Sequence, residues 1–132
     1  MEPRDLALIA LYESDQRSSA IEIDPASPAK AARLIKGVRD HLSDLDTDID
    51  GVSTRWRVAR MPPVDRGILR LGLYELRFEP NTPMAVVVSE AVRLAQTYST
   101  ERSGAFVNGI LAKLAVIERP DEVSRSGKPV ST

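Results

Sequence analysis

The sequence of 132 residues contains no cysteine, one histidine and one tryptophan, and aromatic residues make up only 5% of it. Without cysteine there is neither a disulfide framework nor a thiolate metal site, which fits a cytoplasmic protein. With His41 as the single imidazole, no second histidine is present to complete a catalytic or metal-binding group. These absences exclude the commonest kinds of active site.

Long apolar runs and an excess of one charge are also missing. No stretch approaches the roughly 18 apolar residues that a membrane helix needs, and the polar start of the sequence lacks the pattern of a signal peptide. We therefore expect a cytoplasmic protein without a membrane partner. The net charge is −1, so any contact with nucleic acid must come from a local patch rather than from the overall field.

The composition is that of an ordinary globular protein, with 42% apolar and 28% charged residues. The length fits one domain with a substantial core. Pro120 interrupts the last helical pattern, and the residues after it are polar and rich in serine. We predict a single helical domain over residues 1–119 and a flexible polar tail over residues 120–132.

One stretch predicts the centre of the fold. A pair of prolines at 62–63 suits a first helical turn, and the residues that follow, up to Leu76, are apolar around most of the helix. Only Arg66, Arg70 and Arg77 form a narrow polar stripe. A helix of this kind is normally surrounded by other helices, so we predict that it lies at the centre of the domain.

Helical spacing of apolar residues predicts the other elements. We expect a short helix over residues 5–16 and a long one over 28–53, with a possible bend at 50–51. Residues 84–98 predict another helix, and 99–101 resemble the cap of a last helix that ends before Pro120. No strand pattern competes, so we predict an all-α fold of five main helices with one or two short turns.

Two motifs have ordinary explanations. Residues 46–51 begin like a calcium-binding loop, but the twelfth position, which should be a bidentate glutamate, is Arg57. The acidic residues also continue a helical period, so a solvated helix face is the better interpretation, and no metal is expected. His41 is interpreted as a surface residue of the long helix.

A catalytic arrangement of acidic residues is the weakest interpretation of the sequence. Asp65, Glu75 and Glu90 could be imagined as paired carboxylates of a hydrolase. Helical sequences supply such pairs by chance, and no nucleophile motif or second catalytic group accompanies these residues. We therefore predict a protein that is not an enzyme and that needs no cofactor.

The stretch from Phe106 to Gly109 leaves two interpretations open. Val107 belongs to a buried stripe, and Phe106 points about 100° away from it on a helix. Gly109 costs a helix about 1 kcal/mol relative to alanine. Either Phe106 packs on the first helix and Gly109 permits close packing, or a ligand approaches the helix there.

Several stretches together carry a family resemblance. Residues 56–71, which include Trp56-Arg57 and the Pro-Pro-Val-Asp-Arg-Gly start of the central helix, resemble the central signature of the NusB transcription antitermination family. So do residues 89–95 and residues 99–111, with their Phe-Val-Asn-Gly motif. Shorter matches lie at 10–13 and 37–41. Because these stretches follow one another in the order and at the spacing of the family, the sequence is identified as a member of it.

The resemblance covers about residues 4–117 and implies an all-helical fold of two packed subdomains. It implies a transcription antitermination factor that binds boxA-type RNA together with the ribosomal protein NusE, within rRNA transcription complexes of RNA polymerase. Homodimers also occur in the family. By position, the implied RNA-binding residues are Arg4, Tyr12, Arg102, Ser103, Phe106 and Asn108, and the implied partner-binding residues are Asp65 and Arg66.

Physical chemistry agrees with an RNA site of this composition. Single-stranded RNA is bound by bases stacked on aromatic rings and by cations at phosphates. Tyr12 and Phe106 could form such an aromatic pair if the first and last helices touch. Asn108 could bind a base edge or a 2′-hydroxyl, or it could hold helices together.

The sequence also departs from the family pattern. Arg4 stands alone where several arginines are usual, and Ala85, Gln96 and Ala105 replace common lysines. Each lost phosphate contact weakens RNA binding and its dependence on salt. The alternative is a protein-interaction module with weak or no RNA binding. The resemblance supports it, because the same fold occurs as the N-terminal domain of rRNA cytosine methyltransferases.

Overall fold

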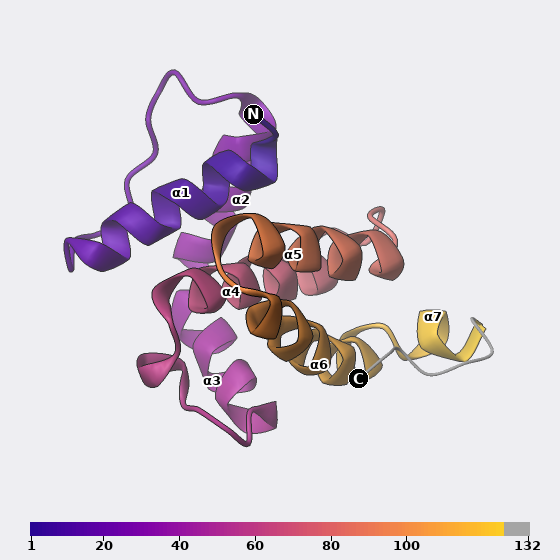
Figure 1. The fold of residues 1–132 in the computed structure, drawn as a ribbon. Helices are drawn as coiled ribbons and strands as arrows, with labels where there is room; N and C mark the ends of the chain where they lie inside the picture. Colours follow the sequence, from indigo (N-terminus) through magenta and orange to yellow (C-terminus); the bar gives the residue numbers. More distant parts are fainter. Residues whose placement is uncertain (126–132) are drawn as a thin grey trace.

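The computed structural model describes residues 1–125, which form seven α-helices and one 3-10 helix without a strand (Figure 1). The elements are α1 (Pro3–Gln16), α2 (Ala29–Asp40), α3 (Leu42–Val52), η1 (Val58–Arg60), α4 (Pro63–Phe78), α5 (Met84–Tyr98), α6 (Glu101–Glu118) and α7 (Pro120–Arg125). The all-α prediction is confirmed. In the described range, no helix is long and apolar enough to cross a membrane.

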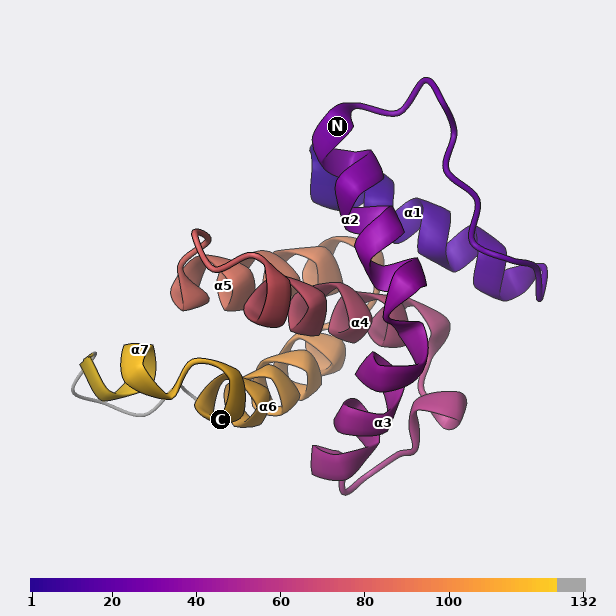
Figure 2. The same ribbon diagram turned by 180° about the vertical axis from the view of Figure 1, so that it is seen from behind.

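Helix α4 is the centre of the structure, as its apolar circumference predicts. It packs against α1, α2, α3, α5 and α6. Figures 1 and 2 show α1 and α2 together at one end of the molecule and α3 and α6 at the other, with α4 and α5 between them. The apolar side chains of α4 that are almost completely buried are Ile68, Leu69, Leu71, Leu73 and Leu76.

The predicted long helix over residues 28–53 is wrong, because the chain breaks at His41 into α2 and α3. His41 leaves the helical conformation, with φ −118° and ψ 15°. Its half-buried ring stacks on Phe78 at the end of α4, with ring centroids 4.1 Å apart. The stacking explains the break, and Gly51, where a bend was expected, lies inside α3.

The polar stripe of α4 is matched by acidic residues from neighbouring helices. Arg70 donates two hydrogen bonds of 2.8 Å to Asp46 of α3. Arg77 donates to Asp48 of α3 and to Glu118 of α6. The acidic face of α3 thus binds α4 instead of only facing solvent, and residues 1–125 contain no group of three side chains arranged to hold a metal ion.

The residues after Pro120 differ from the predicted tail, because Pro120–Arg125 form the short helix α7. Glu122 accepts a 2.7 Å hydrogen bond from the backbone N–H of Met84, at the start of α5. Arg119 donates to the backbone carbonyl of Leu76 at 2.7 Å. These contacts satisfy helix ends and explain the order of α7. Residues 126–132 of the predicted tail lie outside the described range.

Helices α2 and α4 approach closely at Gly37. A Cβ atom at this position would lie 2.1 Å from Cε1 of Tyr74, far inside van der Waals contact. Gly51 of α3 is different, because a Cβ atom there would meet nothing within 4 Å.

We predict that Gly37→Ala lowers the free energy of unfolding by about 1–3 kcal/mol, because the Tyr74 ring or α2 must shift. Gly51→Ala serves as the matched control and should gain up to about 1 kcal/mol from helix propensity. Urea denaturation followed by circular dichroism measures both. Equal stability of the two variants would contradict the proposed close packing.

Candidate nucleic-acid interface

Tyr12 is the most accessible aromatic ring of the predicted site. It lies on α1 and is 39% exposed. It borders a shallow hollow of about 240 Å³ between α1, the start of α4 and the end of α5, which is lined by Leu8, Ile9, Tyr12, Val64 and Tyr98. The lining is mainly apolar, with tyrosine rings at its edge, so it can accept a flat ring or an apolar side chain.

A polar cluster fixes one wall of this hollow. The hydroxyl of Tyr98 donates a 2.8 Å hydrogen bond to Asp5, and Arg93 donates to the same carboxylate at 2.7 Å. The hydrogen bonds from Arg93 and Tyr98 hold the pKa of Asp5 below its ordinary value, and the bond to Asp5 raises the pKa of Tyr98. The Tyr98 ring is therefore held in place beside Tyr12.

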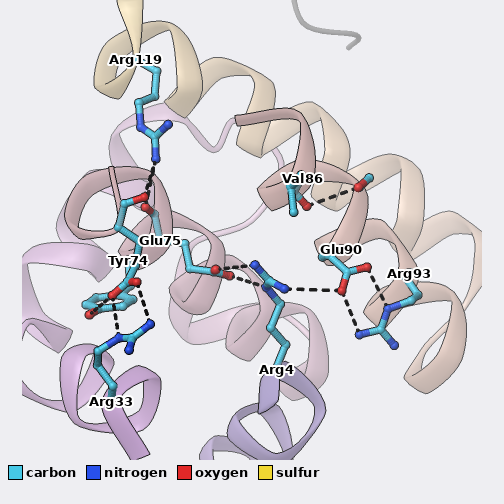
Figure 3. A network of polar contacts seen from close by, with 10 residues as sticks. Arg4, Arg33, Tyr74, Glu75, Val86, Glu90, Arg93 and Arg119 are labelled. Carbon is cyan, nitrogen blue, oxygen red and sulfur yellow. Dashed lines mark hydrogen bonds and ion pairs between the residues drawn. The ribbon is translucent and has the colours of Figure 1, made fainter. Parts of the chain in front are cut away.

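Arg4, predicted to contact RNA, is buried in the structure. Its guanidinium donates to both carboxylate oxygens of Glu75, at 2.9 and 2.8 Å, and lies 3.5 Å from Glu90 (Figure 3). The side chains of Arg4 and Glu75 are 10% and 3% exposed. The hydrogen bond with Glu75 raises the pKa of Arg4 further. In this structure Arg4 fastens α1 to α4.

Two predicted residues, Asp65 and Ser103, are joined through Ser99. The Ser99 hydroxyl donates to Asp65 at 3.1 Å and lies 2.8 Å from the hydroxyl of Ser103. Thr100 caps α6 by accepting the backbone N–H of Ser103 at 3.1 Å. Asp65 is only 1% exposed. Through Ser99 and Ser103, these hydrogen bonds connect the start of α4 to the start of α6.

Arg66 connects three segments near the same place. It donates hydrogen bonds to Asp15 at the end of α1. It also donates to the carbonyls of Val58 and Ala59 in η1, at 3.1 and 3.2 Å. Like Asp65, it shapes the surface at the start of α4 from a largely enclosed position.

Phe106 and Arg102 lie on α6. The half-buried Phe106 ring meets Trp56 edge to face, with centroids 5.2 Å apart. Arg102 is exposed one turn earlier and forms no ion pair within residues 1–125, and Asn108 is half-buried. Trp56 is half-buried against the core beside Phe106.

The structure places Tyr12 and Phe106 in separate hollows instead of one stack. Phe106 lines a second hollow with Arg55, Gly109 and Lys113, whereas the hollow at Tyr12 contains none of these. The reason is helix packing, because α1 rests mainly on α2 and α4, and α6 rests mainly on α5 and α4.

Tyr98, Arg55 and Lys113 border the two hollows at the predicted rings and are not among the residues predicted from the sequence. For Lys113 a signal was available, because it follows Phe106 by seven positions and so shares its helix face. For Tyr98 no local signal exists, since its place beside Tyr12 depends on how α5 packs against α1.

The match with known proteins covers nearly all of this helical body. The model of the NusB family matches residues 1–116. The chain belongs to the NusB family. It is 44% identical over 118 residues to the transcription antitermination protein NusB of Acidothermus cellulolyticus, with 83% of this chain and 81% of that protein covered.

Solved structures of the NusB family share the fold. A structure of T. maritima NusB is similar with a TM-score of 0.81 and 34% identity, covering 92% of this chain and 94% of that chain. A chain from a crystal structure of the antitermination factors NusB and NusE in complex with dsRNA is similar with a TM-score of 0.75 and 27% identity. It covers 87% of this chain and 94% of that chain.

We predict that Glu75→Gln lowers the free energy of unfolding by about 3 kcal/mol, because the buried Arg4 loses its main countercharge. Glu13→Gln is the control, since Glu13 and Arg17 form a pair whose side chains are 55% and 67% exposed. The control should cost about 0.5 kcal/mol or less. Chemical denaturation at neutral pH measures both variants, and a similar cost for the two would refute a structural role for the Arg4–Glu75 pair.

The lowered pKa of Asp5 predicts a dependence of stability on acid. The ionised carboxylate is favoured in the folded state, so its contribution is present above the unfolded pKa of about 4 and is lost as the pH falls below it. Asp5→Asn should be less stable at pH 7 and should lose less stability between pH 5 and pH 2. Thermal unfolding across this range tests this, with Asp44→Asn as control. Parallel curves for Asp5→Asn and wild type would contradict it.

Proposed function

We propose that this chain is a transcription antitermination factor that binds boxA-type RNA together with the ribosomal protein NusE, in rRNA transcription complexes of the cytoplasm and without catalysis. The observation that carries the proposal is the likeness, over 87% of this chain, to NusB in a complex with NusE and dsRNA. Curated relatives bear the name transcription antitermination protein, which supports the same function.

The surface around Tyr12 supports a role in RNA binding. Its ring is accessible and is bordered by Tyr98 and by apolar side chains, which is the environment that stacked bases use. On α6, Arg102 is exposed and free of ion pairs within residues 1–125, so it can face a phosphate. Ser103 and Asn108 would then position the helix that carries these groups.

The burial of Arg4 bears on the strength of this binding. A guanidinium already bound to Glu75 and close to Glu90 has little to offer a phosphate. We therefore expect this chain alone to bind RNA weakly and NusE to supply further basic surface. The start of α4, which Asp65 and Arg66 hold in place, is the proposed contact with that partner.

The burial of Arg4 also favours a second candidate, a protein-interaction module with weak or no RNA binding. In that case NusE would bind, and RNA would not bind even in the presence of NusE. A homodimer that covers the RNA face is a further form of this alternative, and analytical ultracentrifugation would detect it.

Binding of fluorescein-labelled boxA RNA, followed by anisotropy at low salt with and without NusE, tests the proposed function. We expect weak binding by the chain alone and much tighter binding with NusE. Binding of NusE without RNA binding would favour the interaction module. A folded chain that binds neither would end both proposals.

We predict that Tyr12→Ala weakens RNA binding in the presence of NusE by about 1–3 kcal/mol, because a stacked base loses its ring. Tyr12→Phe keeps the ring and should bind like wild type. Val116→Ala removes a 52% exposed apolar side chain far along α6 and is the second control. Unchanged affinity of Tyr12→Ala would assign this ring to packing.

A further inference from the structure

A groove of about 460 Å³ lies between α1 and the connection that follows it, residues 17–28. On its α1 side the lining residues recur at helical spacing from residue 6 to residue 17, which corresponds to a length of about 16 Å. They include Leu6, Ile9, Glu13 and Arg17. This α1 groove shares only Ile9 with the hollow at Tyr12, and none of the residues assigned to RNA or to NusE lines it.

The connection is anchored to the molecule without filling the groove. The backbone of Ser18 lies in the left-handed region, with φ 51°, and its N–H donates to the carbonyl of Asp15 at 3.2 Å. Further along, the half-buried Ile21 and Ile23 pack against the core. Figure 1 shows the connection as an arch that runs from the end of α1 to the start of α2. The groove therefore stays open beside α1.

The inner part of the α1 groove is apolar. It is lined by the buried Ile35 of α2, by the half-buried Leu6 and Ile9 of α1, and by Ile23 of the connection. Its volume lies within the range of roughly 300–1,000 Å³ that is typical of ligand sites. The groove can therefore bury apolar side chains of a ligand.

The middle of the connection leaves its backbone without partners. Within residues 1–125, no backbone N–H or carbonyl group of residues 20–23 forms a hydrogen bond. The neighbouring bonds are those from the N–H of Ser19 to the carbonyl of Ser14 and from the N–H of Ser27 to the carbonyl of Asp24.

The sequence of this unpaired segment resembles that of a strand. Apolar and acidic residues alternate over residues 21–24, which is the period of a strand with one buried face. Extended peptides bind to such segments as an additional strand, since free backbone groups supply affinity and adjacent pockets select alternate side chains. The unpaired segment thus points to a peptide as the ligand of the groove.

The charges at the rim decide which peptide fits. Glu13 and Arg17 lie 3.6 Å apart and neutralise one another. Glu22 and Asp24 also line the groove and form no ion pair within residues 1–125, and Asp24 only accepts a 2.9 Å hydrogen bond from the N–H of Ala26. Two negative charges therefore remain at the rim, and they favour a basic ligand.

We propose that the α1 groove binds an extended peptide segment of a partner protein, in which apolar residues alternate with lysine or arginine. The backbone of the peptide pairs with residues 20–23. Its apolar side chains enter the groove between Ile9 and Ile23, and its cations face Glu22 and Asp24. The inference goes beyond the proposed function, because it assigns a further protein contact to a surface that neither RNA nor NusE needs.

The first experiment uses the fluorescein-labelled peptide Gly-Lys-Val-Lys-Val-Lys-Gly, with binding followed by anisotropy at low salt. We expect saturable binding to the full chain. The control peptide Gly-Lys-Lys-Lys-Val-Val-Gly has the same composition and charge without the alternation, and it should bind about tenfold more weakly. Equal affinities would show attraction of charge alone and would overturn the inference.

The second experiment tests the backbone pairing. Successive N–H groups of an extended strand point to opposite edges, so methylation of the valine nitrogens blocks one edge and methylation of the lysine nitrogens blocks the other. One methylated peptide should lose about tenfold in affinity and the other less than about threefold. Equal losses, or none in either peptide, would contradict binding as an additional strand.

The third experiment removes an apolar lining residue. Ile21 and Ile23 are half-buried isoleucines of the same connection, but only Ile23 lines the groove. Ile23→Ala should weaken binding of the alternating peptide about tenfold, and the matched control Ile21→Ala less than about threefold. Circular dichroism verifies that both variants are folded. The same affinity in both variants would place the peptide elsewhere.

The fourth experiment removes the two unpaired charges. Glu22→Gln/Asp24→Asn should weaken peptide binding about fivefold at low salt, and the asparagine keeps an acceptor for the N–H of Ala26. The charge-matched control is Asp44→Asn/Asp121→Asn, which removes two exposed carboxylates outside the groove. An equal loss in the control would attribute the binding to net charge and overturn the inference.

Competition with NusE separates this inference from the proposed function. If NusE displaces the labelled peptide, the groove is part of the NusE contact, so the inference is overturned and the proposed function stands. If wild type binds the peptide but neither RNA nor NusE, the proposed function falls and the inference stands. Peptide binding that NusE leaves unchanged supports a separate protein contact at the α1 groove.

Discussion

Helix α4 is enclosed on almost every side, and its charged residues must therefore be neutralised inside the structure. A buried charge without a partner is costly. Opposite charges from other helices match Arg66, Arg70, Glu75 and Arg77, and Asp65 accepts a hydrogen bond from Ser99. Arg70 is bound by Asp46 of α3, and Glu75 is bound by Arg4 of α1. The ion pairs thus fix which face of each surrounding helix meets α4, and apolar packing alone would not set these positions.

This constraint also decides what remains for function. A chain with nearly equal numbers of acidic and basic residues has few cations left once the interior is neutralised. Arg4 is used in this way, although its position in the sequence resembles that of an RNA-binding residue. Among the cations outside ion pairs in residues 1–125, Arg55 and Lys113 line the hollow beside Phe106, and Arg102 is exposed one turn before Phe106 on α6. Contacts with a negatively charged partner are therefore best sought at cations that no ion pair neutralises.

The sequence predicts most of the fold because apolar periodicity reports burial directly. The bounds of α5 and the proline start of α4 follow from it. The break at His41 does not, since apolar residues keep helical spacing across it and its cause is stacking on Phe78. The candidate site was less predictable. Helical positions could be assigned to Tyr12 and Phe106, but their separation into two hollows depends on which helices α1 and α6 contact, and no local pattern records that.

The side chains that hydrogen-bond the helix ends at the α4–α5 connection, Arg119 and Glu122, come late in the chain. Pro83, the residue before α5, has no side-chain acceptor to cap that helix, and Glu122 does so instead. Arg119 performs the corresponding task for the carbonyls at the end of α4. During synthesis, α4 and α5 are made before Arg119 and Glu122. The carbonyls at the end of α4 and the N–H of Met84 at the start of α5 are therefore first hydrated by water. The native form of this connection is completed only when the last helical turns have been synthesised, which makes this closure a late event in co-translational folding.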